Sequence, residues 1–252
     1  MEKKVILSVS KAVQVMELLE TAGGGLSLKE LSERLGWAKS TAHGIVSTLA
    51  ASGLVEQRQS DGRYILGLRL FELGCAAGAV WGVGTEGRLR LRALAKQAGE
   101  TAFLAGWGMT DIVILDAAEI RDGIELSPPG TRMPLYCSAP GKVMLAALPP
   151  GEYRQMLRQL SLVRFTARTV ASFEALDRDC DAVRRNGWCV EQEEMAHGRW
   201  TVAAPVCDAD GTARLALGLA GAFSGDGRAP DLQRLGALTV RAARELTVAA
   251  ER

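Results

Sequence analysis

The sequence predicts an α+β protein with a helical N-terminal part, a connecting helix, and a larger C-terminal part built on a mainly antiparallel sheet. Up to about residue 66, apolar residues recur at helical spacing, and beyond residue 85 short strand-like runs alternate with helical ones. Short turns separate these runs, which favours antiparallel pairing. The 252 residues suffice for two domains, expected at 1–67 and 85–252, with a linker helix over 68–84.

Residues 10–53 have the pattern of three short helices. Ser10 is expected to cap the first, and Ser27-Leu28-Lys29-Glu30 has the form of a capping box that begins the second. Gly36 is expected to end the second helix, and a third starts near Ala38. The apolar stripes expected to face the core are Ala12, Val15, Met16 and Leu19 in the first helix, Leu28, Leu31 and Leu35 in the second, and Ala42, Ile45, Val46, Leu49 and Ala50 in the third.

After Gly53 the pattern changes to two short extended runs, residues 54–58 and 64–66. Asp61-Gly62 lies between them, and this dipeptide is typical of a hairpin turn. Two helices followed by a hairpin are the layout of a winged helix-turn-helix, whose second helix enters the major groove of DNA. The sequence therefore indicates double-stranded DNA as a partner.

The third helix has a polar face suited to reading DNA. Base edges are within reach of side chains near its N-terminus, whereas a lysine there suits a phosphate, which adds affinity without sequence information. The alternative interpretation of this helix is an ordinary solvated face. The alternative interpretation of the wing is that its arginines only stabilise the hairpin. The candidate DNA-contacting residues are Lys39, Ser40, Thr41, His43 and Ser47 on the helix and Arg58, Arg63 and Tyr64 on the wing.

Composition alone does not indicate nucleic acid. Lys and Arg number 30 against 29 Asp and Glu, although no acid lies between Arg34 and Val55. The five cysteines show no C-x-x-C spacing and there are two histidines, so no metal site or cofactor is expected. With neither a signal peptide nor an apolar run of about 20 residues, a cytoplasmic protein without a membrane partner is expected.

Beyond residue 67 the pattern predicts one helix and then an alternation of helices and strands. Residues 68–81 are apolar on many sides, which is expected of a linker helix with a dimer seam. In the next helix, Leu89, Leu91, Leu94 and Ala95 are expected to face inward. Helices are expected over 88–98, 142–148, 174–186 and 231–250, and strands over 101–107, 112–117, 123–126, 188–191, 201–206 and 213–220.

Three blocks of sequence follow one another along the chain. They are Leu28-Lys29-Glu30-Leu31 with Lys39-Ser40-Thr41, then Met133 to Lys142 with Thr166-Ala167-Arg168-Thr169, and Arg185-Asn186-Gly187-Trp188 through Glu193-Glu194 to Ala203-Ala204-Pro205-Val206. In these blocks the chain resembles the IclR family of bacterial transcription regulators over almost its whole length. The resemblance implies a winged helix-turn-helix, a linker helix and a GAF-like effector-binding domain, together with homodimers that often pair into tetramers. One departure is Gly44, where family members often carry arginine; glycine weakens a helix by about 1 kcal/mol relative to alanine.

The resemblance also implies an effector pocket, for which ordinary core packing is the alternative at each position. The loop before a helix at 139–140 would offer free N–H groups to a carboxylate, and Glu191 would accept a hydrogen bond from the ligand. Small residues at 218 and 220 would widen the pocket, and Trp107, Trp188 and Trp200 would add aromatic wall, favouring an aromatic or other hydrophobic organic acid. The carried-over positions are Ala139, Pro140, Glu191, Thr201, Gly218 and Ala220.

Three other patterns carry no function on this reading. Residues 82–87 match G-x-G-x-x-G, but a helix-like run precedes them where a dinucleotide site needs a strand. Glu193 and Glu194 are adjacent, so on a strand they would point to opposite faces and form no shared acid pair. His197 has no nucleophile and acid partner in view, so no catalytic residues are expected.

The sequence therefore predicts a regulator, expected to be a repressor, that binds a palindromic operator and responds to a small effector. Two alternatives stay open. In one, the C-terminal domain only oligomerises and DNA binding is ligand-independent. In the other, that domain is an enzyme that converts a small molecule.

Overall fold

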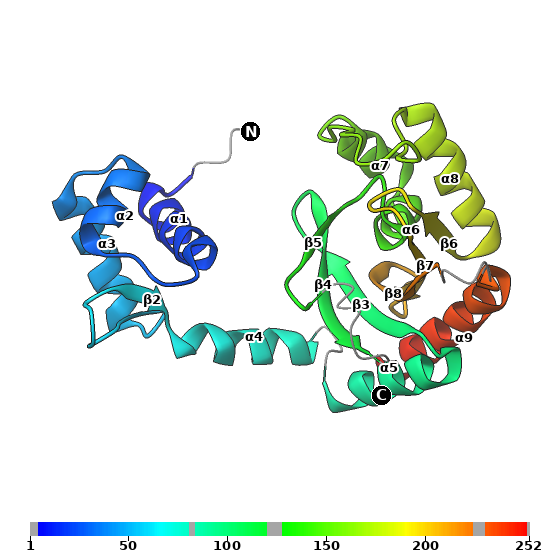
Figure 1. The fold of residues 1–252 in the computed structure, drawn as a ribbon, viewed down its shortest axis with the longest axis horizontal. Helices are drawn as coiled ribbons and strands as arrows, with labels where there is room; N and C mark the ends of the chain where they lie inside the picture. Colours follow the sequence, from blue (N-terminus) through cyan, green and yellow to red (C-terminus); the bar gives the residue numbers. More distant parts are fainter. Residues whose placement is uncertain (1–4, 81–83, 120–127, 224–229, 251–252) are drawn as a thin grey trace. The chain divides into compact units, whose positions relative to one another are not determined.

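The computed structural model describes residues 5–80, 84–119, 128–223 and 230–250, and it has the predicted α+β architecture (Figure 1). The chain divides into two compact units, residues 1–80 and 81–252. The expected linker helix is present as α4 (Leu68–Val80) and falls within the first unit; residues 81–83 lie outside the described part of the chain. Among the described residues, no helix is long and apolar enough to cross a membrane.

Three helices and a two-stranded wing form the rest of the first unit. The elements are α1 (Leu7–Ala22), α2 (Leu28–Leu35), α3 (Lys39–Ala51), β1 (Val55–Gln57) and β2 (Tyr64–Leu66). The capping box is confirmed: Glu30 N–H donates to Ser27 Oγ at 3.3 Å, and the Glu30 carboxylate accepts from Ser27 N–H at 2.8 Å. Gly36 ends α2 in the left-handed conformation at φ 67°, as predicted.

The predicted stripes are largely the core of this unit. Val15, Leu31 and Val46 are completely buried. Two predictions were wrong. Ser10 does not cap α1, because the helix already begins at Leu7 and the Ser10 N–H bonds to the Ile6 carbonyl inside its first turn. Ala50 is exposed. The buried face of α3 consists of Ala42, Val46 and Leu49, and Ala50, one residue after Leu49, points away from that face.

A six-stranded sheet organises the second unit. Its strands are β3 (Thr101–Trp107), β4 (Asp111–Ala118), β5 (Arg132–Pro134), β6 (Cys189–Gln192), β7 (Arg199–Cys207) and β8 (Ala213–Ala222). They lie in the order β5-β4-β3-β8-β7-β6, and every neighbouring pair is antiparallel. The predicted antiparallel sheet is therefore confirmed. The expected strand at 123–126 lies outside the described residues.

Helices cover both faces of this sheet (Figure 1). One face carries α6 (Ala139–Ala147), α7 (Pro150–Leu157) and α8 (Phe173–Asn186); the other carries α5 (Thr85–Ala98) and α9 (Leu232–Ala250). Alternation along β7 divides the core, since Ala203 packs on the α6 side while Val202 and Ala204 pack on the α9 side. Helix α7 and strand β5 were not predicted, and Leu89 of α5 is 60% exposed although it was expected inward.

Helix α6 lies unusually close to the segment that precedes it. A Cβ at Gly141 would lie 2.5 Å from the Leu135 Cα, and no flexible side chain is there to yield. Ser138 fixes the same turn, because its Oγ donates to the Pro134 carbonyl at 2.6 Å and accepts from the Gly141 N–H at 3.2 Å. Glycine at 141 is therefore a packing requirement.

Gly141→Ala is expected to lower the free energy of unfolding by about 1–3 kcal/mol, because the Leu135 backbone must shift. The measurement is urea denaturation. Gly151→Ala in α7 is the matched control, since nothing lies within 4 Å of the added methyl group, and it is expected to be neutral or slightly stabilising. Equal effects of the two substitutions would contradict the packing argument.

Candidate functional site

Helix α3 presents the polar face that the sequence assigned to DNA. Lys39, Ser40, His43 and Ser47 are exposed, and Thr41 is half-buried. The N-cap residue of α3 is Ala38, which has no side chain that could bond the first N–H groups of the helix. Such a helix end attracts phosphate. The surface has the chemistry that groove recognition needs, and its contacts with DNA stay a prediction.

The segment between α2 and α3 is fixed by local contacts. Ser32 Oγ donates to the Trp37 carbonyl at 2.7 Å, and the Trp37 N–H donates to the Ser32 carbonyl at 3.0 Å. The Lys11 ammonium of α1 lies 5.1 Å from the Trp37 ring centre, within range of a cation–π contact. These contacts join all three helices and fix where α3 starts.

The wing arginines have structural partners. Arg58 donates to the Gly24 carbonyl at 2.8 Å and pairs with Asp61, while Arg63 donates to the Gly25 carbonyl at 2.8 Å and pairs with Glu30 at 3.3 Å. Both therefore hold the hairpin against the turn after α1. Hydrogen bonds from the Ser27 backbone and side chain, and then the Arg63 charge, lower the pKa of Glu30.

Tyr64 requires a correction. Its side chain packs in the core of the first unit and is 9% exposed, and its backbone bridges to Leu26. The first residue of β2 points inward because the wing is folded onto the helices. We therefore remove Tyr64 from the proposed DNA-contacting set, which keeps the exposed residues of α3 and, in a secondary role, Arg58 and Arg63.

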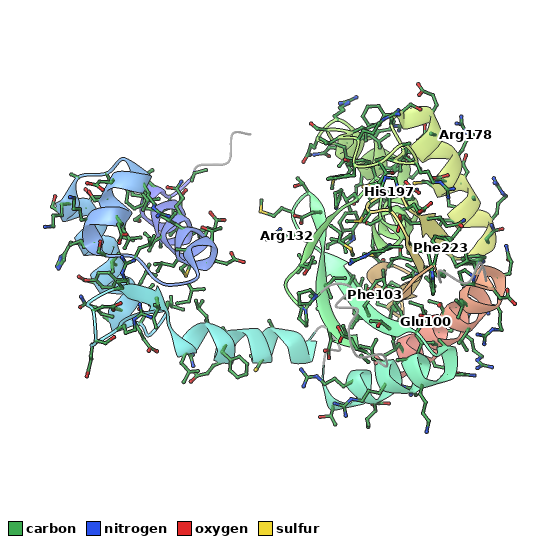
Figure 2. All side chains as sticks on the ribbon, in the orientation of Figure 1. Glu100, Phe103, Arg132, Arg178, His197 and Phe223 are labelled. Atoms are coloured by element: carbon green, nitrogen blue, oxygen red, sulfur yellow. The ribbon has the colours of Figure 1, made fainter. Side chains whose placement is uncertain are left out.

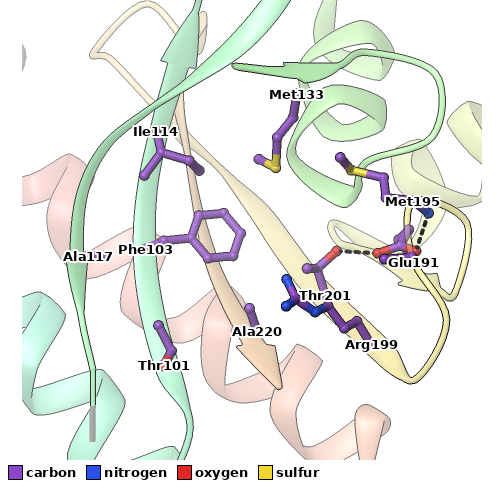
Figure 3. Close-up of a pocket in the computed structure, with 11 residues that line it drawn as sticks. Thr101, Phe103, Ile114, Ala117, Met133, Glu191, Met195, Arg199, Thr201 and Ala220 are labelled. Carbon is purple, nitrogen blue, oxygen red and sulfur yellow. Dashed lines mark hydrogen bonds between the residues drawn. The ribbon is translucent and has the colours of Figure 1, made fainter. Parts of the chain in front are cut away.

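The second unit contains a cavity of about 130 Å³ on the face of the sheet that α6 covers (Figure 3). Its walls are mostly apolar, with a polar end at Glu191 and Thr201. The lining residues are Thr101, Phe103, Ile114, Ala117, Met133, Glu191, Met195, Ala196, Arg199, Thr201 and Ala220. Three of the six carried-over positions, Glu191, Thr201 and Ala220, are therefore brought together.

Glu191 is the buried acid of this cavity. One carboxylate oxygen accepts the N–H groups of Glu194 at 2.5 Å and Met195 at 3.3 Å, and the other accepts the Thr201 hydroxyl at 3.0 Å. Burial raises the pKa of the Glu191 carboxyl above its ordinary value, although these donors act in the opposite direction. The acid is thus held in one orientation at the polar end.

The other three carried-over residues do not line the cavity. Gly218 lies under the Phe103 ring, which a Cβ at 218 would overlap, so the missing side chain makes room for Phe103 instead of widening the pocket. Ala139 and Pro140 are buried at the start of α6. Pro140 has no N–H, and the Gly141 N–H is taken by Ser138, so this helix end is a poor carboxylate seat.

The aromatic wall is also different from the one expected. Trp200 is completely buried on the opposite face of the sheet, Trp188 packs beside Gly236 of α9, and Trp107 packs in the core without lining the cavity. Phe103 is the aromatic residue in the wall (Figure 3). Sequence reasoning missed it, because Phe103 sits in a run that reads as ordinary strand core.

A buried cation lies behind the polar end of the cavity. The Lys142 side chain is 1% exposed, and its ammonium donates to Glu194 at 2.5 Å and Asp179 at 2.7 Å. Burial lowers the pKa of Lys142, but the surrounding negative groups, Glu194 and Asp179 among them, outweigh burial and raise it. Burial also raises the pKa of Glu194 above its ordinary value, with Lys142 opposing.

The adjacent glutamates belong to a turn, and they have different partners. Glu193 has a positive φ of 59° and pairs with Arg168 at 3.1 Å, whereas Glu194 turns inward to Lys142. Glu193 and Glu194 therefore form no shared acid pair, as expected. The expected reason was wrong, because β6 ends at Gln192 and the two glutamates do not lie on a strand. His197 is exposed on the same turn (Figure 2).

The glycine-rich stretch at 82–87 does not follow a strand. Gly82 and Val83 lie outside the described residues, but α4 ends at Val80 and Gly84 caps α5. Among the described ranges, no group of three His, Cys, Asp or Glu side chains is placed to hold a metal ion.

Comparison with known proteins agrees with this geometry. Residues 8–59 match the family model described as IclR helix-turn-helix domain, and residues 80–247 match the one described as bacterial transcriptional regulator IclR C-terminal. The chain belongs to the IclR family of bacterial transcriptional regulators. The HTH-type transcriptional regulator BhcR of Paracoccus denitrificans is 33% identical over 245 residues, which cover 96% of this chain and 86% of that protein.

Solved IclR structures share the fold. An IclR regulator from Alicyclobacillus acidocaldarius has a TM-score of 0.80 and 25% identity, with 98% of this chain and 99% of that one covered. An IclR homologue from Microbacterium hydrocarbonoxydans, solved in complex with 4-hydroxybenzoate, has a TM-score of 0.81 and 21% identity, with coverage of 97% and 99%. The IclR-family assignment thus extends over both units.

Lys142→Met is expected to lower the free energy of unfolding at neutral pH by about 3–5 kcal/mol, because it leaves Glu194 buried without its cation. The pKa of Glu194 is already raised in the fold, and losing Lys142 raises it further. The folded variant then keeps its proton where the unfolded chain has lost it, so stability falls as pH rises and recovers on acidification.

Urea denaturation across mildly acidic to neutral pH measures this effect, with Lys96→Met as the control for removing an exposed lysine of α5. A deficit that does not depend on pH would show that Lys142 acts through packing of its stem and not through its charge.

Proposed function

We propose that this IclR-family regulator binds a palindromic operator as a dimer or as a pair of dimers, and that a small ring-shaped organic acid in the cavity changes its DNA affinity. The observation that carries the proposal is a cavity with apolar walls and a fixed acid in a chain that also presents an exposed recognition helix. A ligand that prefers one arrangement of the C-terminal units shifts the population of DNA-binding states.

The cavity size favours a ligand with one ring. Its volume of about 130 Å³ is similar to that of an apolar cavity of roughly 150 Å³ that accommodates benzene. Phe103, Ile114 and Met133 supply apolar contacts for such a body. The IclR homologue solved with 4-hydroxybenzoate supports the idea that this fold can hold a compact ring acid.

Exposed apolar side chains on α4 support self-association. Leu68, Phe71 and Leu73 are 65%, 69% and 45% exposed, which is unusual for a helix in a monomer. A second copy that covers them would place two recognition helices on half-sites about 34 Å apart or a multiple of that distance. We propose that the protein acts in the cytoplasm and represses transcription by blocking a promoter.

The buried thiols of Cys137 and Cys180 do not support the enzyme alternative. Burial raises the pKa of Cys137 to about 12 and that of Cys180 to about 11, so neither provides a thiolate nucleophile at neutral pH. The related proteins are regulators. We therefore propose a binding role and not a catalytic one.

The test selects an operator from random-sequence DNA with the purified full-length protein and then titrates ring acids, 4-hydroxybenzoate first, into the complex. A selected palindrome, and a ligand-dependent change in its affinity, are expected. Folded protein without any sequence preference would overturn the DNA-binding role. A selected operator whose affinity no compound changes would favour the ligand-independent alternative.

On α3, His43→Ala is expected to cost about 1–3 kcal/mol for the selected operator and little for unrelated DNA, because a base contact is lost. Lys39→Ala is expected to weaken binding to all sequences and to reduce the slope of log affinity against log salt by about 1. Lys96→Ala in α5 serves as the charge control. Competition binding at several salt concentrations measures these effects, and equal losses on both DNAs for His43→Ala would contradict its assignment.

A further inference from the structure

The cavity wall contains one cation and one anion among its described residues, Arg199 and Glu191. They form no ion pair with each other, and in the described part of the chain Arg199 has no acid partner elsewhere. Arg168 and Arg214 of this unit, by contrast, each pair with a carboxylate. A cation and an anion that share a pocket without pairing leave room for a ligand that joins them.

The sheet directs Arg199 into this position. Trp200 and Val202 of β7 pack on the α9 side, so Arg199, Thr201 and Ala203 project from the opposite face. Figure 3 shows Arg199 beside Thr201 at the edge of the cavity. Its backbone is fixed, because it is paired with Ala222 in the sheet and its carbonyl accepts the Glu193 N–H at 2.9 Å.

The two charged residues differ in what they can still bind. Glu191 uses one oxygen for two backbone N–H groups, and the other accepts only the Thr201 hydroxyl. Since a carboxylate oxygen has two lone pairs, the second oxygen has one acceptor position left. Arg199 provides a planar fork of N–H donors that matches a carboxylate. The apolar side chains of Phe103, Ile114 and Met133 line the part of the cavity that lies away from these two charged residues (Figure 3).

We propose that Arg199 is the anion anchor of the effector pocket: it binds the carboxylate of a one-ring acid whose opposite end donates a hydrogen bond to Glu191. The inference rests on the proposed function, because it assumes that the effector occupies this cavity. It also assigns an orientation. The ligand carboxylate lies near the beginning of β7, where Arg199 is. It lies away from the N-terminus of α6, where Pro140 provides no donor.

The experiment measures binding of four compounds to the full-length protein by calorimetry: 4-hydroxybenzoate, its uncharged amide, benzoate, and phenol. Wild-type protein is expected to bind 4-hydroxybenzoate about 10- to 100-fold more tightly than the amide, which lacks the charge. Benzoate, which lacks the donor, is expected to bind about 3- to 10-fold more weakly than 4-hydroxybenzoate.

Arg199→Gln is expected to remove most of the preference for the acid over the amide while leaving affinity for the amide within about a factor of 3. Arg185→Gln, an exposed arginine of α8, is the matched control and is expected to keep the full preference. Glu191→Gln is expected to reduce the difference between 4-hydroxybenzoate and benzoate without changing the preference for acid over amide.

Several outcomes would overturn the proposal. Arg199→Gln could retain the wild-type preference, or lose acid and amide equally, which would indicate a structural role. Wild-type protein could bind none of the four compounds, which would exclude the ligand class. Selection of the operator does not depend on these compounds. The proposed DNA-binding role is therefore tested separately, and it can be correct even if Arg199 does not bind the effector carboxylate.

Discussion

The ammonium of Lys142 is the constraint on which the C-terminal unit depends. It comes from α6, it is almost completely buried, and it binds Asp179 of α8 and Glu194 of the 193–198 turn. A buried cation must keep its acids, because an unpaired buried charge is costly, so these three segments are held in one arrangement. The Glu194 N–H in turn holds Glu191. The polar end of the cavity is thus tied to two helices outside it.

Features that depend on neighbours in sequence were predictable. The capping box at Ser27, the end of α2 at Gly36 and the antiparallel sheet follow from local chemistry and from hydrophobic periodicity, which a single sequence contains. Glu191 and Thr201 were found through the family resemblance, and the structure brings them together by direct pairing of β6 with β7. The sequence pattern also identified the wing, but it did not show that the Tyr64 side chain would be buried against the helices.

Features that depend on tertiary packing were not predictable. Leu89 has the right spacing for a core residue, yet its side chain is 60% exposed. Pro140 was expected to contact the ligand only because of the family resemblance. The structure of the start of α6 shows that Pro140 has no N–H and that the Gly141 N–H is already bonded to Ser138. Nothing in the sequence around Arg199 distinguishes it from other surface arginines. Only the structure shows that it lines the cavity.

Phe103 and Gly218 are opposite each other on β3 and β8, and the ring occupies the space that a side chain at 218 would fill. The residue at either position therefore limits the size of the residue at the other. A relative with a side chain at the second position needs a smaller residue at the first, and the wall of its pocket is then supplied by the other strand. Ligand preference within this fold can diverge through that single coupled exchange while the sheet and its helices stay as they are.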